Sequence, residues 1–436
     1  MKLKELINKK ILILGLGREG TDTFKFLRKL FPKKNLGIGD RDEKVKRKAK
    51  SEKLIKWHLG SNYLKALKDY DVIIKSPGIS PKEIKPYLKR GQTITSQAEI
   101  FFDNCPGLII GVTATKGKST TTSLIYKILK YNGLKAHLIG NIGKPVLNLL
   151  SSATDKDIYV YELSSHQLSN LKKSPPIAVF LNVFPEHLDY YRNFQEYIQA
   201  KSHITLYQNN KDYLVFNSKN EIVDKIANKS KAQKQDLNSV KIEKVMKLKD
   251  IPLKGKFYLD NVKAAILVGR IFQIPDKKIG LAIKQFKPLA HRLEPVGIFK
   301  GIEFYNDSLS TIPETTIAAM NALGNKVQTI MLGGFDRGLN FEKLAKEVSK
   351  SKIKNVILFP TTGQIIWKEI NKIINKRPLK HFFVNNMADA VKIAYQQTSK
   401  NKICLLSTAS PSFSIFKDYK EKGNLFKKYV KEYSRH

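Results

Sequence analysis

Short apolar runs recur along this chain, and most end in a glycine-rich or polar stretch before a segment with helical spacing of apolar residues. We predict strands at residues 10–14, 35–39, 71–75, 92–95, 108–112, 157–161, 177–181, 302–305, 328–332, 355–359 and 402–406, and edge strands with surface loops over 210–256. Strands that alternate with helices are typical of parallel α/β sheets. The pattern therefore predicts an α/β fold of three domains, at residues 1–104, 105–290 and 291–436.

The most informative stretch covers residues 108–122. The predicted strand is followed by the turn Ala114-Thr115-Lys116-Gly117 and then by a helix that starts at Lys118-Ser119. In a phosphate-binding loop the backbone N–H groups of such a turn point at one spot, the lysine reaches the β- and γ-phosphates, and the hydroxyl suits Mg²⁺. Val112 stands where the strict pattern has glycine, so this loop is a relative of that motif, and the alternative is a Thr/Lys-rich helix cap. We predict a P-loop-type central domain that binds ATP.

Residues 10–40 carry a dinucleotide-type fingerprint. A strand leads into Gly15-Leu16-Gly17-Arg18-Glu19-Gly20, a helix follows to about residue 30, and a second strand ends at Asp40. The glycines allow close approach to a pyrophosphate, and the acid can take a sugar hydroxyl. A nicotinamide cofactor, a UDP-sugar and an empty Rossmann-like turn all fit. We therefore predict a Rossmann-like first domain, with Ser76-Pro77-Gly78 at the same edge of its sheet. The later alternation of strands and helices predicts a second Rossmann-like domain at the C-terminus.

Two strands of the central domain end near side chains that bind metals. Glu162 follows the strand predicted at 157–161, and His187 lies in the polar stretch after the strand predicted at 177–181. Strand ends of a doubly wound sheet open on one side, here the side of the phosphate loop, so both residues are candidate Mg²⁺ ligands. The alternative for each is an ordinary surface group.

Composition limits the other classes of function. The chain has 436 residues with 42% hydrophobic content, which predicts a globular protein, and without an 18-residue apolar run we expect no membrane insertion. The two cysteines, Cys105 and Cys404, lack metal-ligand spacing and fit a reducing cytoplasm. The net charge of +40 comes mainly from lysines spread along the chain, without a nucleic-acid-binding module. We expect no nucleic-acid partner, although such a charge attracts anionic small substrates.

Several short motifs follow one another in a fixed order. They are Ser76-Pro77-Gly78-Ile79, residues 113–120, Gly140-Asn141-Ile142-Gly143, Glu162-Leu163-Ser164-Ser165, residues 182–189, His291-Arg292, Asn306-Asp307-Ser308 and Gly333-Gly334. In these motifs the chain resembles the Mur ligase family over essentially its whole length. The resemblance implies domains that bind, in turn, the UDP end of the substrate, ATP and the incoming amino acid. It also implies an acyl-phosphate mechanism, in which the substrate carboxylate attacks the γ-phosphate of ATP and the amine of the amino acid then displaces the phosphate.

The late run at residues 407–424 resembles in particular the members that add D-glutamate to UDP-N-acetylmuramoyl-L-alanine in peptidoglycan precursor synthesis. For such an enzyme we expect a cytoplasmic monomer. A sister ligase or a folylpolyglutamate-type synthetase would share the ATP motifs. A nicotinamide oxidoreductase would explain only residues 10–40, and a basic nucleic-acid-binding ATPase would explain the net charge.

The resemblance also assigns roles by position. The implied catalytic residues are Lys118, Glu162, His187 and Lys201. Ser119 and Glu162 match the ligands of one Mg²⁺, while His187 and Lys201 match those of a second, with Lys201 as a carbamylated lysine; without the resemblance Lys201 would be one more solvated lysine. The implied ATP contacts are Thr113, Thr115, Lys116, Gly117, Lys118, Ser119, Thr120, Asn261, Arg292 and Asp307. The implied UDP-substrate contacts are Gly17, Arg18, Asp40, Arg41, Ser76, Gly78, Asn141, Ser164 and Gln167, and the implied amino-acid contacts are Thr311, Arg337, Ser412, Phe413 and Tyr419.

Three positions depart from the family pattern. Ala114 replaces a usual glycine, which is expected to restrict the backbone of the phosphate loop. Phe257-Tyr258 stands where many members have His-Asn, so the adenine pocket differs there. Leu309 occupies a position that is lysine in some members, next to the implied amino-acid pocket.

Overall fold

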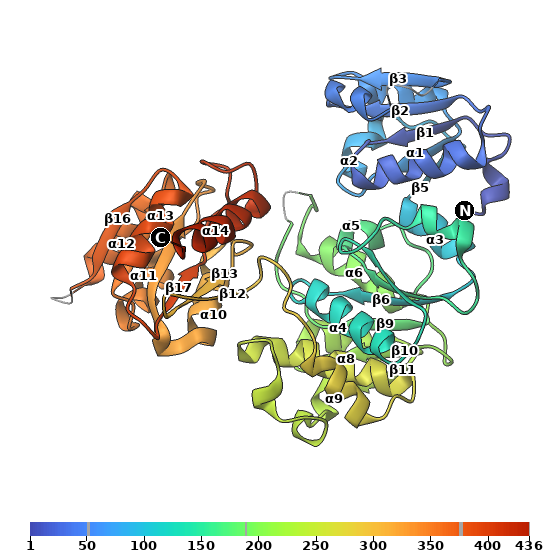
Figure 1. Ribbon diagram of the computed structural model, residues 1–436. Helices are drawn as coiled ribbons and strands as arrows, with labels where there is room; N and C mark the ends of the chain where they lie inside the picture. The colour runs from blue at the N-terminus through green and yellow to red at the C-terminus, as the bar shows by residue number, and fades with distance from the viewer. Residues whose placement is uncertain (50–52, 188–189, 375–377, 436) are drawn as a thin grey trace. The chain divides into compact units, whose positions relative to one another are not determined.

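The computed structural model describes residues 1–49, 53–187, 190–374 and 378–435 (Figure 1). The chain forms two compact units. Unit 1 comprises Met1–Leu248 and Asp260–Lys284, and unit 2 comprises Lys249–Leu259 and Gln285–His436. The segment Lys249–Leu259 therefore belongs to unit 2, although unit 1 residues flank it on both sides in the sequence.

The first sheet of unit 1 contains the glycine fingerprint. Its strand order is β3-β2-β1-β4-β5, with parallel pairing between neighbours. Ile11 and Ile13 of β1 pack into one hydrophobic cluster and Leu12 and Leu14 into another, because successive side chains of a strand point to opposite faces. The elements are β1 Ile11–Leu14, α1 Arg18–Leu30, β2 Leu36–Asp40, β3 Ile55–Leu59, β4 Val72–Lys75, α2 Pro81–Ile84, β5 Thr93–Thr95 and α3 Gln97–Asn104.

The second sheet of unit 1 contains the phosphate loop. Its order is β11-β10-β9-β6-β8-β7, and β6 lies between β8 and β9. The prediction of edge strands over 210–256 is correct for β11 and wrong for β10, which lies between β9 and β11 with Leu214 and Val215 fully buried. The elements are β6 Leu108–Thr113, α4 Lys118–Tyr131, β7 Ala136–Gly140, β8 Ile158–Glu162, α5 Ser165–Leu168, β9 Ile177–Phe180, α6 Phe194–Leu206, β10 Tyr213–Phe216, α7 Glu221–Lys229, β11 Gln233–Asp236, α8 Leu259–Ile271 and α9 Asp276–Lys284.

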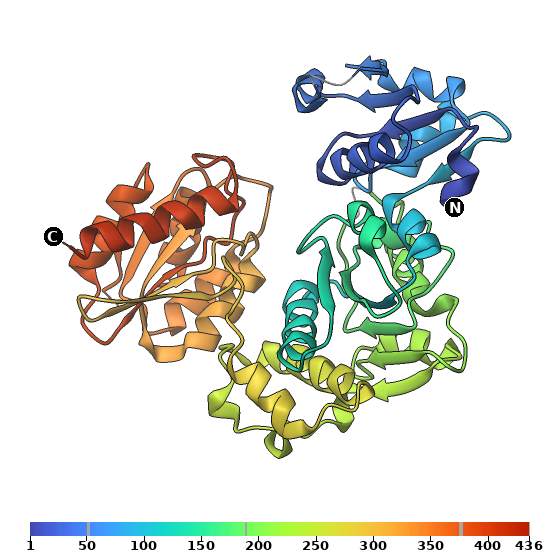
Figure 2. The same cartoon turned by 45° about the vertical axis from the view of Figure 1, so that its right-hand side comes forward.

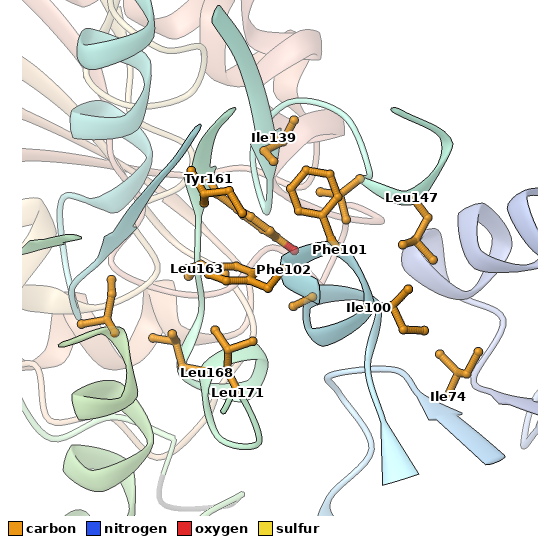
Figure 3. Packing of buried hydrophobic residues seen from close by; sticks show 14 of the residues in the cluster. Ile74, Ile100, Phe101, Phe102, Ile139, Leu147, Tyr161, Leu163, Leu168 and Leu171 are labelled. Carbon is orange, nitrogen blue, oxygen red and sulfur yellow. The ribbon is translucent and has the colours of Figure 1, made fainter. Parts of the chain in front are cut away.

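The two sheets of unit 1 share a hydrophobic core. Figure 3 shows Phe101 and Phe102 of α3 beside Tyr161 of β8, and the ring centroids of Phe101 and Tyr161 are 5.9 Å apart. Leu163 and Leu171 belong to the same cluster. This shared burial explains why residues on both sides of position 104 form one compact unit.

Unit 2 has one mixed sheet with helices on both faces (Figure 2). Its order is β12-β13-β17-β14-β15-β16, and among the described strands only β12 and β13 pair antiparallel. Helices α10, α11 and α12 pack on one face, and α13 and α14 pack on the other. The elements are β12 Glu294–Phe299, β13 Ile302–Asn306, α10 Pro313–Leu323, β14 Val327–Gly333, α11 Glu342–Lys350, β15 Asn355–Phe359, α12 Thr362–Ile373, β16 Lys380–Phe383, α13 Met387–Gln397, β17 Ile403–Leu406 and α14 Tyr419–Tyr433.

The predicted α/β fold with mainly parallel sheets is confirmed. Three sheets fit an architecture of three α/β domains, while the boundaries at 104 and 290 stay predictions. Among the described residues no helix is both long and apolar enough to cross a membrane.

Candidate functional site

The phosphate loop connects β6 to α4. Gly117 caps the helix with a φ of 92°, a conformation that favours glycine. Asn261 of α8 donates from Nδ2 to the backbone oxygen of Gly117 at 3.3 Å, and a Cβ on Gly117 would lie 3.0 Å from the amide oxygen of Asn261. The predicted ATP contacts Gly117 and Asn261 are thus adjacent, and glycine is required for this approach.

Asn182, which follows β9, supports the other side of the loop. Its Oδ1 accepts from the backbone N–H groups of Thr115 at 3.1 Å and Lys116 at 2.9 Å, while its Nδ2 donates to the oxygen of Lys116 at 3.0 Å. One side chain therefore fixes the orientation of two peptide units. Asn182 was missing from the predicted contacts, although its place directly after a buried strand marks it as a loop-facing residue.

Ala114 fits the loop despite the expected restriction. Its backbone is not among the described positions with positive φ, so the conformation suits an alanine. Its backbone oxygen accepts from Lys118 Nζ at 2.8 Å and also from Lys201 Nζ at 2.8 Å. Two lysine side-chain nitrogens therefore converge on one carbonyl.

Lys201 lies on α6 and is only 1% exposed. Besides its bond to Ala114, its Nζ lies 3.3 Å from Thr113 Oγ1 and 5.0 Å from the centre of the Tyr197 ring. Burial, reinforced by the charge of Lys118, holds the pKa of Lys201 well below its ordinary value of 10.5. The interpretation of Lys201 as a solvated surface lysine is therefore wrong.

The candidate metal ligands occupy the same sheet edge. Glu162 is the last residue of β8 and 4% exposed, and Ser119 in the first turn of α4 is 8% exposed. His187 has a φ of 59°, and its ring centroid is 6.0 Å from that of Tyr197. Within the described ranges no three His, Cys, Asp or Glu side chains gather closely enough to hold a metal. A metal here would need the hydroxyl of Ser119 and a modified Lys201, so the two Mg²⁺ sites stay predictions.

The glycine fingerprint meets the second sheet through Arg18. Its guanidinium donates to the backbone oxygens of Asn141, at 3.2 Å, and of Gly143. Two predicted UDP-substrate contacts, Arg18 and Asn141, are thus brought together. Asp40 instead accepts from the backbone N–H of Leu16 at 2.6 Å, so in this structure its carboxylate supports the glycine turn.

The remaining UDP-substrate candidates lie around these groups. Ser76 donates from its hydroxyl to the oxygen of Gly15 at 2.7 Å. Gly17 and Gly78 have open space where a Cβ would stand. Arg41 is exposed and pairs with Glu83 at 3.7 Å. Gly17 and Gly78 therefore leave room for a ligand, whereas Ser76 and Arg41 have partners within the protein in this structure.

Ser164 and Gln167 form a capping box at the start of α5. Gln167 is 2% exposed, and its Nε2 donates to Glu19 Oε1 at 2.7 Å. Burial raises the pKa of Glu19 to about 7, against the opposing effect of the Gln167 hydrogen bond. Gln167 therefore contacts the fingerprint helix directly, a contact that the sequence did not reveal.

Asp307 is the central polar residue of unit 2. It is 7% exposed and accepts from the backbone N–H of Leu293 at 3.0 Å and from the hydroxyls of Ser310 at 2.5 Å and Ser407 at 2.8 Å. Burial raises its pKa to about 6, although these bonds oppose the shift. Arg292, the other predicted ATP contact of this unit, precedes Leu293.

Tyr258 and Leu309, two positions near Asp307 that depart from the family pattern, are also described by the structure. Tyr258, in the Lys249–Leu259 segment, is 8% exposed, and burial next to the charge of Asp307 raises its pKa to about 12. Leu309 donates from its backbone N–H to the oxygen of His291 at 3.1 Å. The predicted ATP contacts thus divide between unit 1 and unit 2.

The predicted amino-acid contacts lie at the carboxyl ends of β13, β14 and β17. The guanidinium carbon of exposed Arg337 is 6.0 Å from the ring centre of Phe413, which is 58% exposed. Ser412 is 3% exposed, and its hydroxyl has no hydrogen-bond partner among the described residues. Thr311 lies between β13 and α10, next to the N-cap residue Ile312, and Tyr419 begins α14. The exposed guanidinium of Arg337 suits a carboxylate ligand.

Two family models match the chain. Residues 9–96 match the Mur ligase MurD-like N-terminal domain, and residues 112–279 match the Mur ligase middle domain. UDP-N-acetylmuramoylalanine–D-glutamate ligases of Acetivibrio thermocellus and Clostridium acetobutylicum are 33% and 34% identical to it, each over 98% of this chain and 97% of the relative. The chain belongs to the Mur ligase family. The family predicted from the motifs is thereby confirmed, together with the ligase class.

Solved Mur ligases share the fold. UDP-N-acetylmuramate-alanine ligase MurC from Thermotoga maritima aligns with a TM-score of 0.60 and 16% identity over 98% of this chain and all of that one. MurF ligase from Thermotoga maritima in complex with ADP aligns with a TM-score of 0.58 and 14% identity over 97% and 95%. The fingerprint at residues 10–40 falls inside the matched N-terminal Mur ligase domain, which decides against a nicotinamide oxidoreductase.

Proposed function

We propose that this Mur ligase joins D-glutamate to UDP-N-acetylmuramoyl-L-alanine with hydrolysis of ATP to ADP and phosphate, as a cytoplasmic monomer in peptidoglycan precursor synthesis. The observation that carries the proposal is the identity of 30–34% over nearly the whole chain to ligases named for this reaction. The phosphate loop and the exposed cation of unit 2 supply the nucleotide and amino-acid ends of such a reaction.

In the first step the carboxylate of the UDP substrate attacks the γ-phosphorus of ATP and ADP leaves, giving an acyl phosphate. In the second step the amine of D-glutamate attacks the acyl carbon, phosphate leaves and the amine loses a proton. Both steps develop negative charge on phosphoryl oxygens, so catalysis needs positioned cations and N–H donors. Lys118, whose Nζ donates to the backbone oxygens of Ala114 and Thr115, is a cation held at the loop.

Mur ligases use ATP and Mg²⁺, and the residues of this sheet edge fit the metal. Mg²⁺ takes oxygen ligands, which Ser119 and Glu162 offer. When bound, the metal neutralises phosphoryl charge and orients the phosphates. We place one Mg²⁺ at Ser119 and Glu162 and a second at His187 and carbamylated Lys201.

The surroundings of Lys201 support its carbamylation. A neutral amine nitrogen attacks CO₂, an N–C bond forms, and one proton leaves, so that the side chain ends in an anionic carbamate. Burial favours the neutral amine that this reaction requires. The resulting oxygens are suitable Mg²⁺ ligands, whereas an ammonium would repel the metal.

The proposal is tested by phosphate release from ATP. We expect release with UDP-N-acetylmuramoyl-L-alanine and D-glutamate together, and little with either one alone. A panel of amino acids in place of D-glutamate identifies the preferred amine. A higher rate with another amino acid would assign the protein to a sister ligase, and release stimulated by nucleic acid alone would contradict the ligase proposal.

A further inference from the structure

Helix α14 packs on the rest of unit 2 along one face near its N-terminus. Tyr419, Lys422 and Gly423 are three and four positions apart and share that face. The backbone oxygen of Tyr419 accepts from Ser308 Oγ at 2.9 Å. A Cβ on Gly423 would lie 2.2 Å from His291 Nδ1 and 2.4 Å from Ser308 Oγ, so the helix backbone itself lies against these side chains.

Lys422 is the charged side chain of this face, and it is 1% exposed. Its Nζ donates to Thr408 Oγ1 at 2.5 Å, in the loop that follows β17. Burial lowers the pKa of Lys422 to about 7, and the carboxylate of Asp307 opposes that shift. The Lys422 side chain takes no part in the two reaction steps proposed above.

The bond from Lys422 fixes the direction of the next hydrogen bond. In its charged form Lys422 carries donors only, so Thr408 Oγ1 must accept from it and must use its own proton elsewhere. Two backbone oxygens are within reach, that of Ser410 at 3.0 Å and that of Ser310 at 3.3 Å. Ser410 belongs to the loop after β17 and Ser310 to the loop after β13. Thr408 therefore links the loop after β17 to the loop after β13. The bond from Lys422 determines that the Thr408 hydroxyl donates in this link.

These two loops carry three of the amino-acid contacts of the proposed function, Thr311, Ser412 and Phe413. Thr311 follows Ser310 in the loop after β13, and Ser412 lies in the same loop as Thr408, after β17. Asp307 binds both loops as well, through the hydroxyls of Ser310 and Ser407. The position of Thr311 relative to Ser412 thus depends on the hydrogen bonds beneath them.

We infer that Lys422 is a positioning residue for the incoming amino acid, which holds residues 307–311 and 407–412 together from beneath the site. It does not touch the amino acid, because its side chain is buried. The inference rests on the proposed function for the identity of the ligand, and the loop geometry can be tested separately.

The first test compares three variants of the full chain. Lys422→Met keeps a side chain of similar length and removes the donor. We expect its KM for D-glutamate to rise about 10-fold or more, as for loss of a charge-assisted hydrogen bond, with the KM for the UDP substrate within about twofold of wild type. Lys422→Arg restores donors and should recover much of the affinity. Lys428→Met, at an exposed position of the same helix, is the matched control and should behave as wild type.

Stability separates positioning from a purely structural role. Because burial outweighs the attraction of Asp307 and lowers the pKa of Lys422, its charged form is less favourable in the folded chain than in the unfolded chain, so the Tm of Lys422→Met should not fall near pH 7. An unchanged KM for D-glutamate in this variant would overturn the inference. Equal losses for all substrates together with a lower Tm would overturn it too, because they would show a general loss of folding.

Amide hydrogen exchange tests the loops without any substrate. We expect faster exchange in residues 307–311 and 407–412 in both Lys422→Met and Thr408→Val, and wild-type exchange in Lys428→Met. Exchange that is the same in all variants would overturn the inference. If wild-type protein does not use D-glutamate but the two loops still loosen together, the proposed function fails and the positioning role stands.

Discussion

Two lysines, Lys201 in unit 1 and Lys422 in unit 2, are buried to the same extent, each 1% exposed. Each donates to a group at a strand end, the oxygen of Ala114 for Lys201 and the hydroxyl of Thr408 for Lys422. Their charged neighbours differ. Lys118 shares the Ala114 oxygen with Lys201, whereas Asp307 is the charge that acts on Lys422.

This difference shows that burial alone does not decide what a lysine does. Burial lowers the pKa of both residues and nearby carboxylates oppose the shift at both, but only at Lys201 does a neighbouring cation, Lys118, add to it. Lys201 is therefore suited to react as a neutral amine. Lys422 keeps enough of its charge near neutral pH to act as a hydrogen-bond donor.

The largest expected effect comes from Lys201→Ala. Loss of the proposed carbamate ligand of the metal should lower kcat by at least about 100-fold, while ATP binding, measured by calorimetry, largely survives. Protein prepared with ¹³C-bicarbonate should show a carbamate signal in the wild type and none in the variant. Lys229→Ala, at an exposed helix end, is the control. Wild-type activity in Lys201→Ala would contradict the role assigned to this lysine.

Arg337 differs from the two buried lysines because it is an exposed cation of unit 2. Arg337→Ala should weaken D-glutamate use by about 30-fold, since a charge-assisted pair is lost, with little change in the KM for ATP. Arg337→Lys, which keeps the charge and loses the planar fork, should fall in between. A large rise in the KM for ATP with an unchanged KM for D-glutamate would make Arg337 a nucleotide contact.

The smallest expected effect is a pH dependence in the contribution of Lys422 to the stability of the folded protein. Its pKa is about 7 in the folded protein and 10.5 in an unfolded chain, so between these values the unfolded state binds more protons. Wild-type stability therefore rises with pH across this window, and the contribution of Lys422 is absent in Lys422→Met. We expect the variant to melt about 2–4 °C above wild type near pH 7, with a difference that shrinks towards pH 10. A constant difference would show that Lys422 titrates normally.

Local sequence was enough to predict the phosphate loop, because its parts are adjacent in the chain. Gly117, Lys118 and Ser119 follow a buried strand after the short turn at residues 114–116, and their geometry depends on that turn. The support from Asn182 and the burial of Lys201 could not be predicted from the residues, since both depend on packing between segments more than 60 positions apart. For Lys201 only the family resemblance pointed to a role, and nothing in the pattern pointed to Lys422.

The missed strands have a common cause. The strands β3, β7, β12 and β16 were absent from the predicted set, and each lies at an edge of its sheet. An edge strand is covered less completely, so its sequence lacks the unbroken apolar run of β1 or β8. Residues such as Lys380-His381 in β16 therefore resemble loop sequence.

The segment Lys249–Leu259 has a consequence for synthesis of the protein. It leaves the ribosome before residues 285–436, although it is part of the unit that those residues complete. Gly255 packs so closely on Ala322 that an added Cβ would lie 2.8 Å from that side chain, and Tyr258 is buried. During synthesis this segment therefore lacks its packing partners while residues 260–284 complete unit 1. A gene fragment that begins at residue 285 would lack these contacts, so unit 2 cannot be produced whole from one uninterrupted C-terminal piece of that length.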